Sequence, residues 1–135
     1  MKQTVLMIDD DIDDVMLAKS TFESLKADVE FHYLLTPDDI VHYLEEKYNG
    51  HLPDLILLDL NMPAKDGRDV LQELKANEEY SGIPVVIFTT SRSEEDKANC
   101  FRLKANSFVP KPSSFNHWEP VMHSICALYI KSSLN

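Results

Sequence analysis

Four short apolar runs in this sequence lead directly into side chains that can do chemistry. These side chains are Asp9 to Asp11 after VLMI, Asp59 after LILL, Thr89 and Thr90 at the end of IPVVIFTT, and Lys111 after FVP. Carboxylates held close together repel one another and raise each other's pKa. A divalent cation relieves that repulsion, and oxygen-only ligands favour Mg²⁺, with Mn²⁺ as the alternative. The residue types therefore indicate a metal-assisted site that also contains an amine.

Each of these residues also has a purely structural interpretation. Asp11 or Asp13 would cap the following helix, and Lys111 would be a solvated surface lysine. Asp59 would be a loop acid and Thr89 a β-forming residue. These readings would have to hold after four separate strands at once, so the joint pattern favours a functional site. The histidines are scattered and are interpreted as surface or core residues: His32, His42, His51, His117 and His123.

Apolar runs alternate with amphipathic segments along the whole chain. Strands are expected at residues 5–8, 29–35, 55–59, 83–90 and 107–110, the second of them an edge strand. Helices are expected at residues 13–27, after Thr36, at 67–77, after Ser91 and at 115–130. Continuous apolar strands between helices predict an α/β fold. Its doubly wound, mainly parallel five-stranded sheet is covered by helices on both faces, and the carboxyl ends of its strands form the ligand site.

Local signals predict where two helices begin and which faces are buried. Thr36 is expected to cap one helix with Pro37 at its first position, and Ser91 to Glu94 has capping-box spacing. The helix after Ser91 should bury Ala98, Phe101 and Leu103. The last helix should bury Trp118, Val121, Met122, Ile125 and either Leu128 or Tyr129.

Bulk composition narrows the class of protein. The chain has 135 residues and a net charge of −10, which fits one domain and argues against nucleic acid or an anionic membrane as the main partner. Cys100 and Cys126 show no metal or disulfide spacing, so a cytoplasmic location is expected. Neither a signal peptide nor a membrane-spanning run is evident. Only one helix's length follows Lys111, so residues 1–135 are expected to form a single domain without an output domain.

Four motifs give the sequence a specific resemblance. They are IDDD at residues 8–11, PDLILLDLNMPAKDG at 53–67, IPVVIFTTS at 83–91 and FVPKP at 108–112. Their order and spacing resemble the receiver domain of two-component response regulators over nearly the whole chain. The sequence is similar in particular to small stand-alone regulators, including those that partner phytochrome-type kinases. The resemblance implies a flavodoxin-like sheet with strand order 2-1-3-4-5.

The resemblance also implies a role for each site residue. Asp59 matches the phosphoacceptor, which takes a phosphoryl group from a kinase phosphohistidine. Asp10, Asp59 and the backbone carbonyl of Asn61 match the metal ligands, and Asp9 matches the acid that holds the ion through water. Lys111 matches the cation that binds the phosphoryl oxygens. The family commonly has a cis bond after this lysine, here before Pro112.

The same resemblance implies a switch. Thr89 and Phe108 match the hydroxyl and the mobile aromatic residue of the switch, and the N–H groups of Asn61 and Thr90 match those that contact the phosphate. The altered surface would be formed by the fourth helix, fifth strand and fifth helix. Departures from the family pattern are Phe108 in place of the frequent Tyr and Lys104 in place of Gly. At Lys104 either φ is positive or the helix ends differently.

The expected function is a phosphorylation-activated signalling switch rather than an enzyme. Its partners would be a sensor histidine kinase or a histidine phosphotransfer protein, together with an unnamed target, and a homodimer is one option. One alternative is a pseudo-receiver that binds partners without phosphorylation, but the complete acid, hydroxyl and lysine set argues against it. The other is a Mg²⁺-dependent aspartyl-phosphate phosphatase, which usually has a second Asp where this chain has Asn61.

Overall fold

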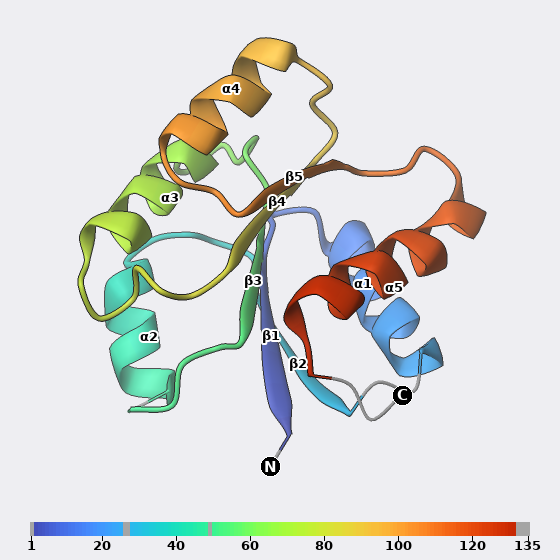
Figure 1. The fold of residues 1–135 in the computed structure, drawn as a ribbon, viewed down its shortest axis with the longest axis horizontal. Helices are drawn as coiled ribbons and strands as arrows, with labels where there is room; N and C mark the ends of the chain where they lie inside the picture. Colours follow the sequence, from blue (N-terminus) through green and yellow to red (C-terminus); the bar gives the residue numbers. More distant parts are fainter. Residues whose placement is uncertain (1, 26–27, 49, 132–135) are drawn as a thin grey trace.

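The computed structural model describes residues 2–25, 28–48 and 50–131 and contains five strands that alternate with helices (Figure 1). The strands are β1 (Gln3–Ile8), β2 (Val29–Leu34), β3 (Leu55–Leu58), β4 (Val85–Thr89) and β5 (Ser107–Pro110). The helices are α1 (Ile12–Ser24), α2 (Ile40–Tyr48), α3 (Gly67–Ala76), α4 (Glu94–Arg102), a 3₁₀ turn at Phe115–His117, and α5 (Trp118–Tyr129). In the part of the chain so described, no helix is long and apolar enough to cross a membrane.

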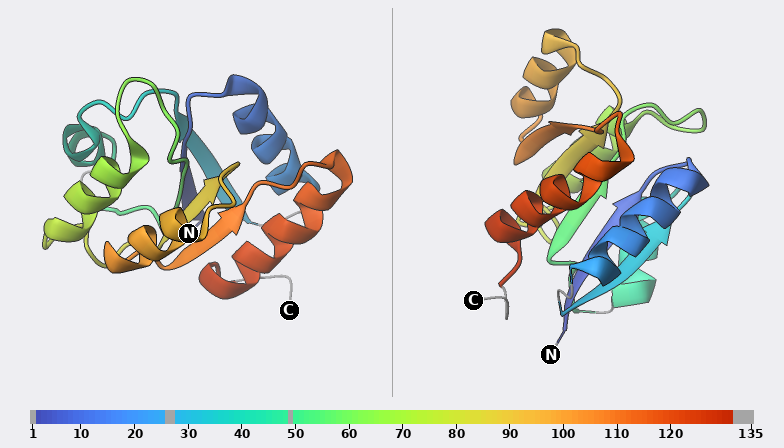
Figure 2. Two further views of the ribbon diagram at one scale, coloured as in Figure 1. Left: turned by 90° about the horizontal axis from the view of Figure 1, so that it is seen from above. Right: turned by 90° about the vertical axis from the view of Figure 1, so that its right-hand side faces the viewer.

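All strand pairs in the sheet are parallel, and the order is β2-β1-β3-β4-β5. Helices α1 and α5 lie on one face, whereas α2, α3 and α4 lie on the other (Figures 1 and 2). Each face has its own cluster of buried apolar side chains. The predicted doubly wound sheet and its strand order are confirmed, and parallel topology places all the carboxyl ends of the strands at one edge.

Strand β3 is buried along its whole length because both faces of the sheet are covered. Ile56 and Leu58 pack toward α2, α3 and α4, while Leu55 and Leu57 pack toward α1 and α5. Burial of a leucine or isoleucine side chain stabilises a fold by about 1.5–3 kcal/mol. The strand is therefore fixed in the centre of the sheet, and Asp59 directly follows it.

Two helix starts differ from the prediction. Helix α2 begins at Ile40 rather than at Pro37, because Asp39 takes a left-handed backbone conformation with φ 54°. The Thr36 hydroxyl instead accepts a hydrogen bond from the Asp38 N–H at 3.4 Å and closes a turn. Helix α4 is capped by Ser93, whose hydroxyl accepts from the Asp96 N–H, and not by Ser91.

The predicted inner face of α4 is wrong at two of three positions. Ala98 is exposed and Phe101 is 44% exposed, while Leu103 packs partly against the core. Cys100 is the buried residue of this nine-residue helix. The helix is rotated so that Cys100 faces the sheet, which leaves an aromatic ring in solvent.

The inner face predicted for the last helix is largely confirmed. Trp118, Met122 and Ile125 are buried, Val121 and Tyr129 are partly buried, and Leu128 is 72% exposed. Tyr129 is therefore the inward residue of the two alternatives that the sequence left open.

The chain around β5 follows most of the backbone expectations. Lys104, just beyond α4, has φ 73°, as expected where the family frequently has Gly. Pro110 lies on edge strand β5, where a residue without a backbone N–H is tolerated. The Lys111–Pro112 bond is trans, in contrast to the cis bond common in the family, since no cis peptide occurs in the described residues. The Lys111 N–H bonds the Thr89 carbonyl at 2.6 Å, which ties the end of β5 to β4 without a cis bond.

Gly67 is required because its backbone passes close to the backbone of Asp59 and Leu60. Its N–H bonds the Leu60 carbonyl at 3.0 Å, and an added Cβ would lie 2.2 Å from the Asp59 carbonyl oxygen and 2.7 Å from Leu60 Cα. Both neighbours are backbone atoms, so the loop itself would have to move.

We therefore expect Gly67→Ala to lower the free energy of unfolding by about 1–3 kcal/mol, as overpacking does. The matched control is Gly82→Ala, because a Cβ at Gly82 meets nothing within 4 Å. Urea denaturation of both variants measures the difference. Equal stability of the two variants would show that the loop is not closely packed.

Candidate functional site

The carboxyl edge of the sheet brings together the residues predicted for the site. Ligand oxygens of Asp9, Asp10 and Asp59 lie within 4.8 Å of one another. Asp9, Asp59, Thr89 and Lys111 are buried, and Asp10 is exposed. Asn61, three residues after the end of β3, and Thr90, directly after β4, are also exposed. The alternative of a solvated surface lysine is wrong, since Lys111 is only 5% exposed.

The Lys111 ammonium is shared among three carboxylates. Its Nζ donates to Asp9 Oδ2 and to Asp14 Oδ2, both at 2.7 Å, and lies 3.8 Å from Asp59 Oδ2. Asp14 was not predicted from the sequence. It lies on the first turn of α1, and the only available signal was its place three residues after the helix-capping Asp11.

Burial and charge act in opposite directions on these groups. Burial raises the pKa of Asp9 to about 6, although its hydrogen bond and charge interaction with Lys111 act to lower it. Burial likewise raises the pKa of Asp59, against the charge of Lys111 and the nearby Thr89 hydroxyl. Burial disfavours the Lys111 ammonium, but hydrogen bonds to Asp14 and Asp9 outweigh this effect and raise its pKa.

The acid cluster fits a divalent cation. Asp59 Oδ1 is buried and has no hydrogen-bond partner among the described residues, so one carboxylate oxygen is left with its lone pairs unused. The donor set of Asp9, Asp10 and Asp59 consists of oxygen alone, which suits a hard ion. The groups that could hold a cation are therefore those predicted, and no histidine is in the cluster.

The loop after β4 is held by side chains around the site. The Thr89 hydroxyl accepts from the Ser91 N–H at 3.3 Å, and the Ser91 hydroxyl donates to Asp96 at 2.6 Å. Arg92 donates to the Lys111 carbonyl at 3.0 Å and so joins this loop to the end of β5. On β5, Phe108 pairs with Ile87, two residues before Thr89, and packs partly buried against the core. Because side chains two residues apart on a strand point to the same face, Thr89 and Phe108 lie on the same face of the sheet.

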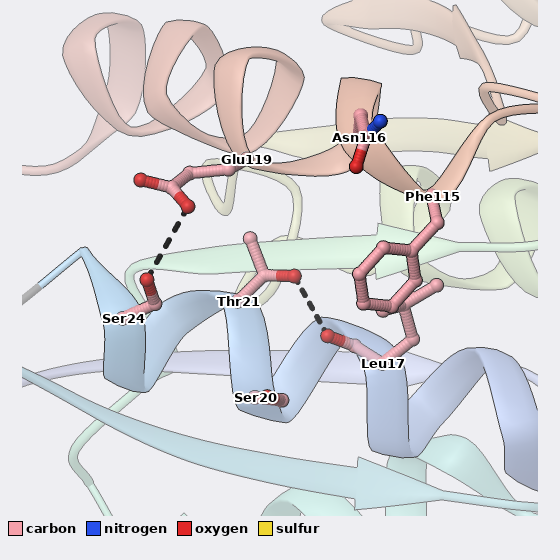
Figure 3. Close-up of a pocket in the computed structure, with 7 residues that line it drawn as sticks. All are labelled: Leu17, Ser20, Thr21, Ser24, Phe115, Asn116 and Glu119. Carbon is pink, nitrogen blue, oxygen red and sulfur yellow. Dashed lines mark hydrogen bonds between the residues drawn. The ribbon is translucent and has the colours of Figure 1, made fainter.

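A groove between α1 and α5 is separate from the acid cluster (Figure 3). It has a volume of about 260 Å³, and Phe115 at its rim is 73% exposed. Ser24 donates to Glu119 across it at 3.3 Å. The lining residues lie on the α1 and α5 side of the sheet and add no metal ligand.

Sequence comparison assigns the family. The model of the response regulator receiver domain matches residues 5–120, which is most of the chain. The response regulator Rcp1 of Synechocystis is 30% identical over 133 residues, covering 96% of this chain and 90% of Rcp1. The probable methanogenesis regulatory protein FilR2 of Methanothrix harundinacea is 32% identical over 90% of this chain and 79% of that protein. The chain belongs to the response regulator receiver domain family of two-component signalling.

Solved structures agree with this assignment. The phosphorylated cyanobacterial phytochrome response regulator RcpA superimposes with a TM-score of 0.88 at 28% identity, over 97% of this chain and 96% of that one. The Mn²⁺-bound form of Rcp1 superimposes with a TM-score of 0.83 at 32% identity, over 93% of this chain and 92% of Rcp1. The receiver identity and the flavodoxin-like fold predicted from the sequence are confirmed.

We expect Lys111→Ala to destabilise the metal-free protein by about 3 kcal/mol at pH 7.5, because it leaves buried carboxylates without their cation. Lys111 stays charged at neutral pH, since its pKa is raised. Asp9, with a pKa of about 6, is largely protonated at pH 5, so fewer charges are stranded there and the loss should be smaller.

Urea denaturation at pH 5 and pH 7.5 measures this difference. Lys97→Ala, at an exposed position on α4, is the control and should change little at either pH. An equal loss in Lys111→Ala at both pH values would contradict the charge argument.

Proposed function

We propose that this receiver domain accepts a phosphoryl group on Asp59 from a histidine-phosphorylated partner. The observation that supports this best is the geometry around Asp59: a buried oxygen without a hydrogen bond, two further carboxylates within ligand distance and an ammonium 3.8 Å away. A carboxylate placed among groups that neutralise charge is what phosphoryl transfer requires of a protein.

In the proposed reaction a carboxylate oxygen of Asp59 attacks the phosphorus atom. An O–P bond forms and the P–N bond breaks, and the electron pair leaves with the histidine nitrogen. Asp10, Asp59, the Asn61 carbonyl and, through water, Asp9 would hold Mg²⁺, which when bound supplies charge neutralisation for the phosphoryl oxygens. Lys111 supplies the remaining positive charge, and the N–H groups of Asn61 and Thr90 orient the phosphoryl group.

The signal follows from the added charge. A phosphoryl group brings about two negative charges to the edge of the sheet, and the Thr89 hydroxyl moves to bind one of its oxygens. The space that Thr89 vacates admits a rotation of Phe108. The surface formed by α4, β5 and α5 then changes, and the exposed Phe101 and Leu128 give it apolar contact area for a partner.

The proposed partners are proteins. Receiver domains interact with histidine kinases, and the names of RcpA and similar regulators favour a phytochrome-type kinase or its phosphotransfer protein as the donor here. We further propose that the domain works in the cytoplasm and passes its signal to a target protein or a second copy of itself.

Asn61 favours a switch over a phosphatase. A phosphatase of this kind needs an acid two residues after its nucleophile, and Asn61 cannot act as a general base. Hydrolysis of the acyl phosphate would then be slow, and the domain would turn over no external substrate. A phosphorylation-independent binding module is disfavoured because such a module needs no buried Lys111 among carboxylates.

Incubation with Mg²⁺ and acetyl phosphate should add one phosphoryl group to the wild-type protein, read as an increase in intact mass. Asp59→Asn and addition of a chelator should each abolish the adduct. Asp69→Asn removes an exposed carboxylate of α3 and should leave the adduct in place.

No adduct on the wild-type protein would favour the phosphorylation-independent module. Rapid release of phosphate over many turnovers would instead favour the phosphatase. An adduct that persists in Asp59→Asn would place the phosphoacceptor elsewhere.

Thr89→Ala should uncouple phosphorylation from the surface change, because it removes the hydroxyl that binds the phosphoryl oxygen. Backbone NMR with Mg²⁺ and beryllofluoride, a phosphoryl mimic, should show amide shifts over α4 and β5 in the wild-type protein. Thr89→Ser keeps the hydroxyl and should retain most of those shifts, whereas Thr89→Ala should lose them. Equal shifts in both variants would exclude Thr89 from the coupling.

A further inference from the structure

Asp14 contacts Lys111 but has no role in the proposed phosphoryl transfer. It does not belong to the cluster of Asp9, Asp10 and Asp59 that could hold a cation. Its Oδ2 nevertheless accepts a hydrogen bond from Lys111 Nζ at 2.7 Å, as short as the bond from Lys111 to Asp9. Asp14 is therefore bound to the lysine and not to the metal site.

The backbone fixes Asp14 in this position. The Asp11 side chain caps α1 and accepts hydrogen bonds from the Asp13 N–H at 3.0 Å and the Asp14 N–H at 3.2 Å. Asp14 thus lies in the first turn, where an acidic side chain is also favoured by the helix dipole. Its carboxylate is 24% exposed and reaches the 5%-exposed Lys111 from the solvent side.

The ammonium has three N–H donors, and two of them are used by Asp9 and Asp14. Asp59 at 3.8 Å is beyond hydrogen-bond distance. The third N–H is left for a phosphoryl oxygen on Asp59, and the bonds to Asp9 and Asp14 restrain how far the ammonium can move toward it. Asp9 would share its carboxylate between Lys111 and a bound metal ion, whereas Asp14 lies outside the acid cluster and would keep its bond to the lysine.

We propose that Asp14 is a positioning residue that acts through Lys111: it restrains the ammonium, offsets its charge and so limits how strongly Lys111 binds a phosphoryl group on Asp59. This inference rests on the proposed function. Asp14 sets the balance between the free and phosphorylated states without touching the phosphoryl group. Removal of the Asp14 charge therefore strengthens the binding of a phosphoryl group at Asp59.

Beryllofluoride affinity in Mg²⁺, measured by isothermal titration calorimetry, tests the proposal. Asp14→Asn should bind about fivefold more tightly than the wild type, the scale expected for loss of one partly exposed charge pair. Asp13→Asn is the matched control. It removes the same charge from the neighbouring position, which is exposed and makes no ion pair with Lys111 in the described residues, so its affinity should change little.

Two further measurements test whether the effect of Asp14 passes through Lys111. In a Lys111→Ala background, Asp14→Asn should have no additional effect, since its action passes through the lysine. In the metal-free protein, ¹⁵N NMR of the lysine ammonium groups should show a Lys111 signal protected from exchange, which Asp14→Asn shifts and Asp13→Asn does not.

Binding by Asp14→Asn that is weaker than, or equal to, that of Asp13→Asn overturns the proposal, as does an effect that survives in Lys111→Ala. Wild-type protein that binds no beryllofluoride at all rejects the proposed phosphoacceptor itself. The two failures are therefore distinguishable.

Discussion

A single buried ammonium surrounded by carboxylates is the interaction on which the site depends. Lys111 lies within 4 Å of Asp9, Asp14 and Asp59, and its charge offsets part of the cost of burying carboxylates at this edge of the sheet. The balance is incomplete, because three carboxylates face one ammonium and burial still raises the pKa of Asp9 to about 6. An excess of negative charge remains, and it is this excess that makes the edge of the sheet receptive to a cation.

The fold holds Lys111 and the carboxylates around it close together. Parallel strands end at one edge, and helices on both faces bury β3, so Asp59 follows a segment with little freedom to move. The hydrogen bond from Gly67 to Leu60 closes the loop beneath Asp59, and the bond from Lys111 to Thr89 ties β5 to β4. Rigidity at the acceptor and mobility at the adjoining loop are both needed for a switch.

The sequence predicts most of this arrangement because apolar strands and the polar residues after them are local signals. The convergence of Asp9, Asp59 and Lys111 was predictable from these signals, and Asp11 was one of two possible caps. The order of the strands was implied by the family resemblance. The outward face of α4 was not predictable, because a nine-residue helix allows several registers and Phe101 looks like a core residue. Asp14 was missed because its partner lies 97 residues away, and no spacing rule links α1 to the end of β5.

The proposed function requires Asp59 to be the acceptor in a metal-assisted site formed by Asp9, Asp10 and the Asn61 carbonyl. A crystal structure of the protein soaked with Mn²⁺ and beryllofluoride tests it most directly, since anomalous scattering locates the metal independently. We expect one manganese peak beside Asp10 and Asp59, with beryllium bonded to an Asp59 oxygen and Lys111 in contact with a fluoride. Manganese bound away from this edge, or an unmodified Asp59 with the mimic bound elsewhere, would contradict it.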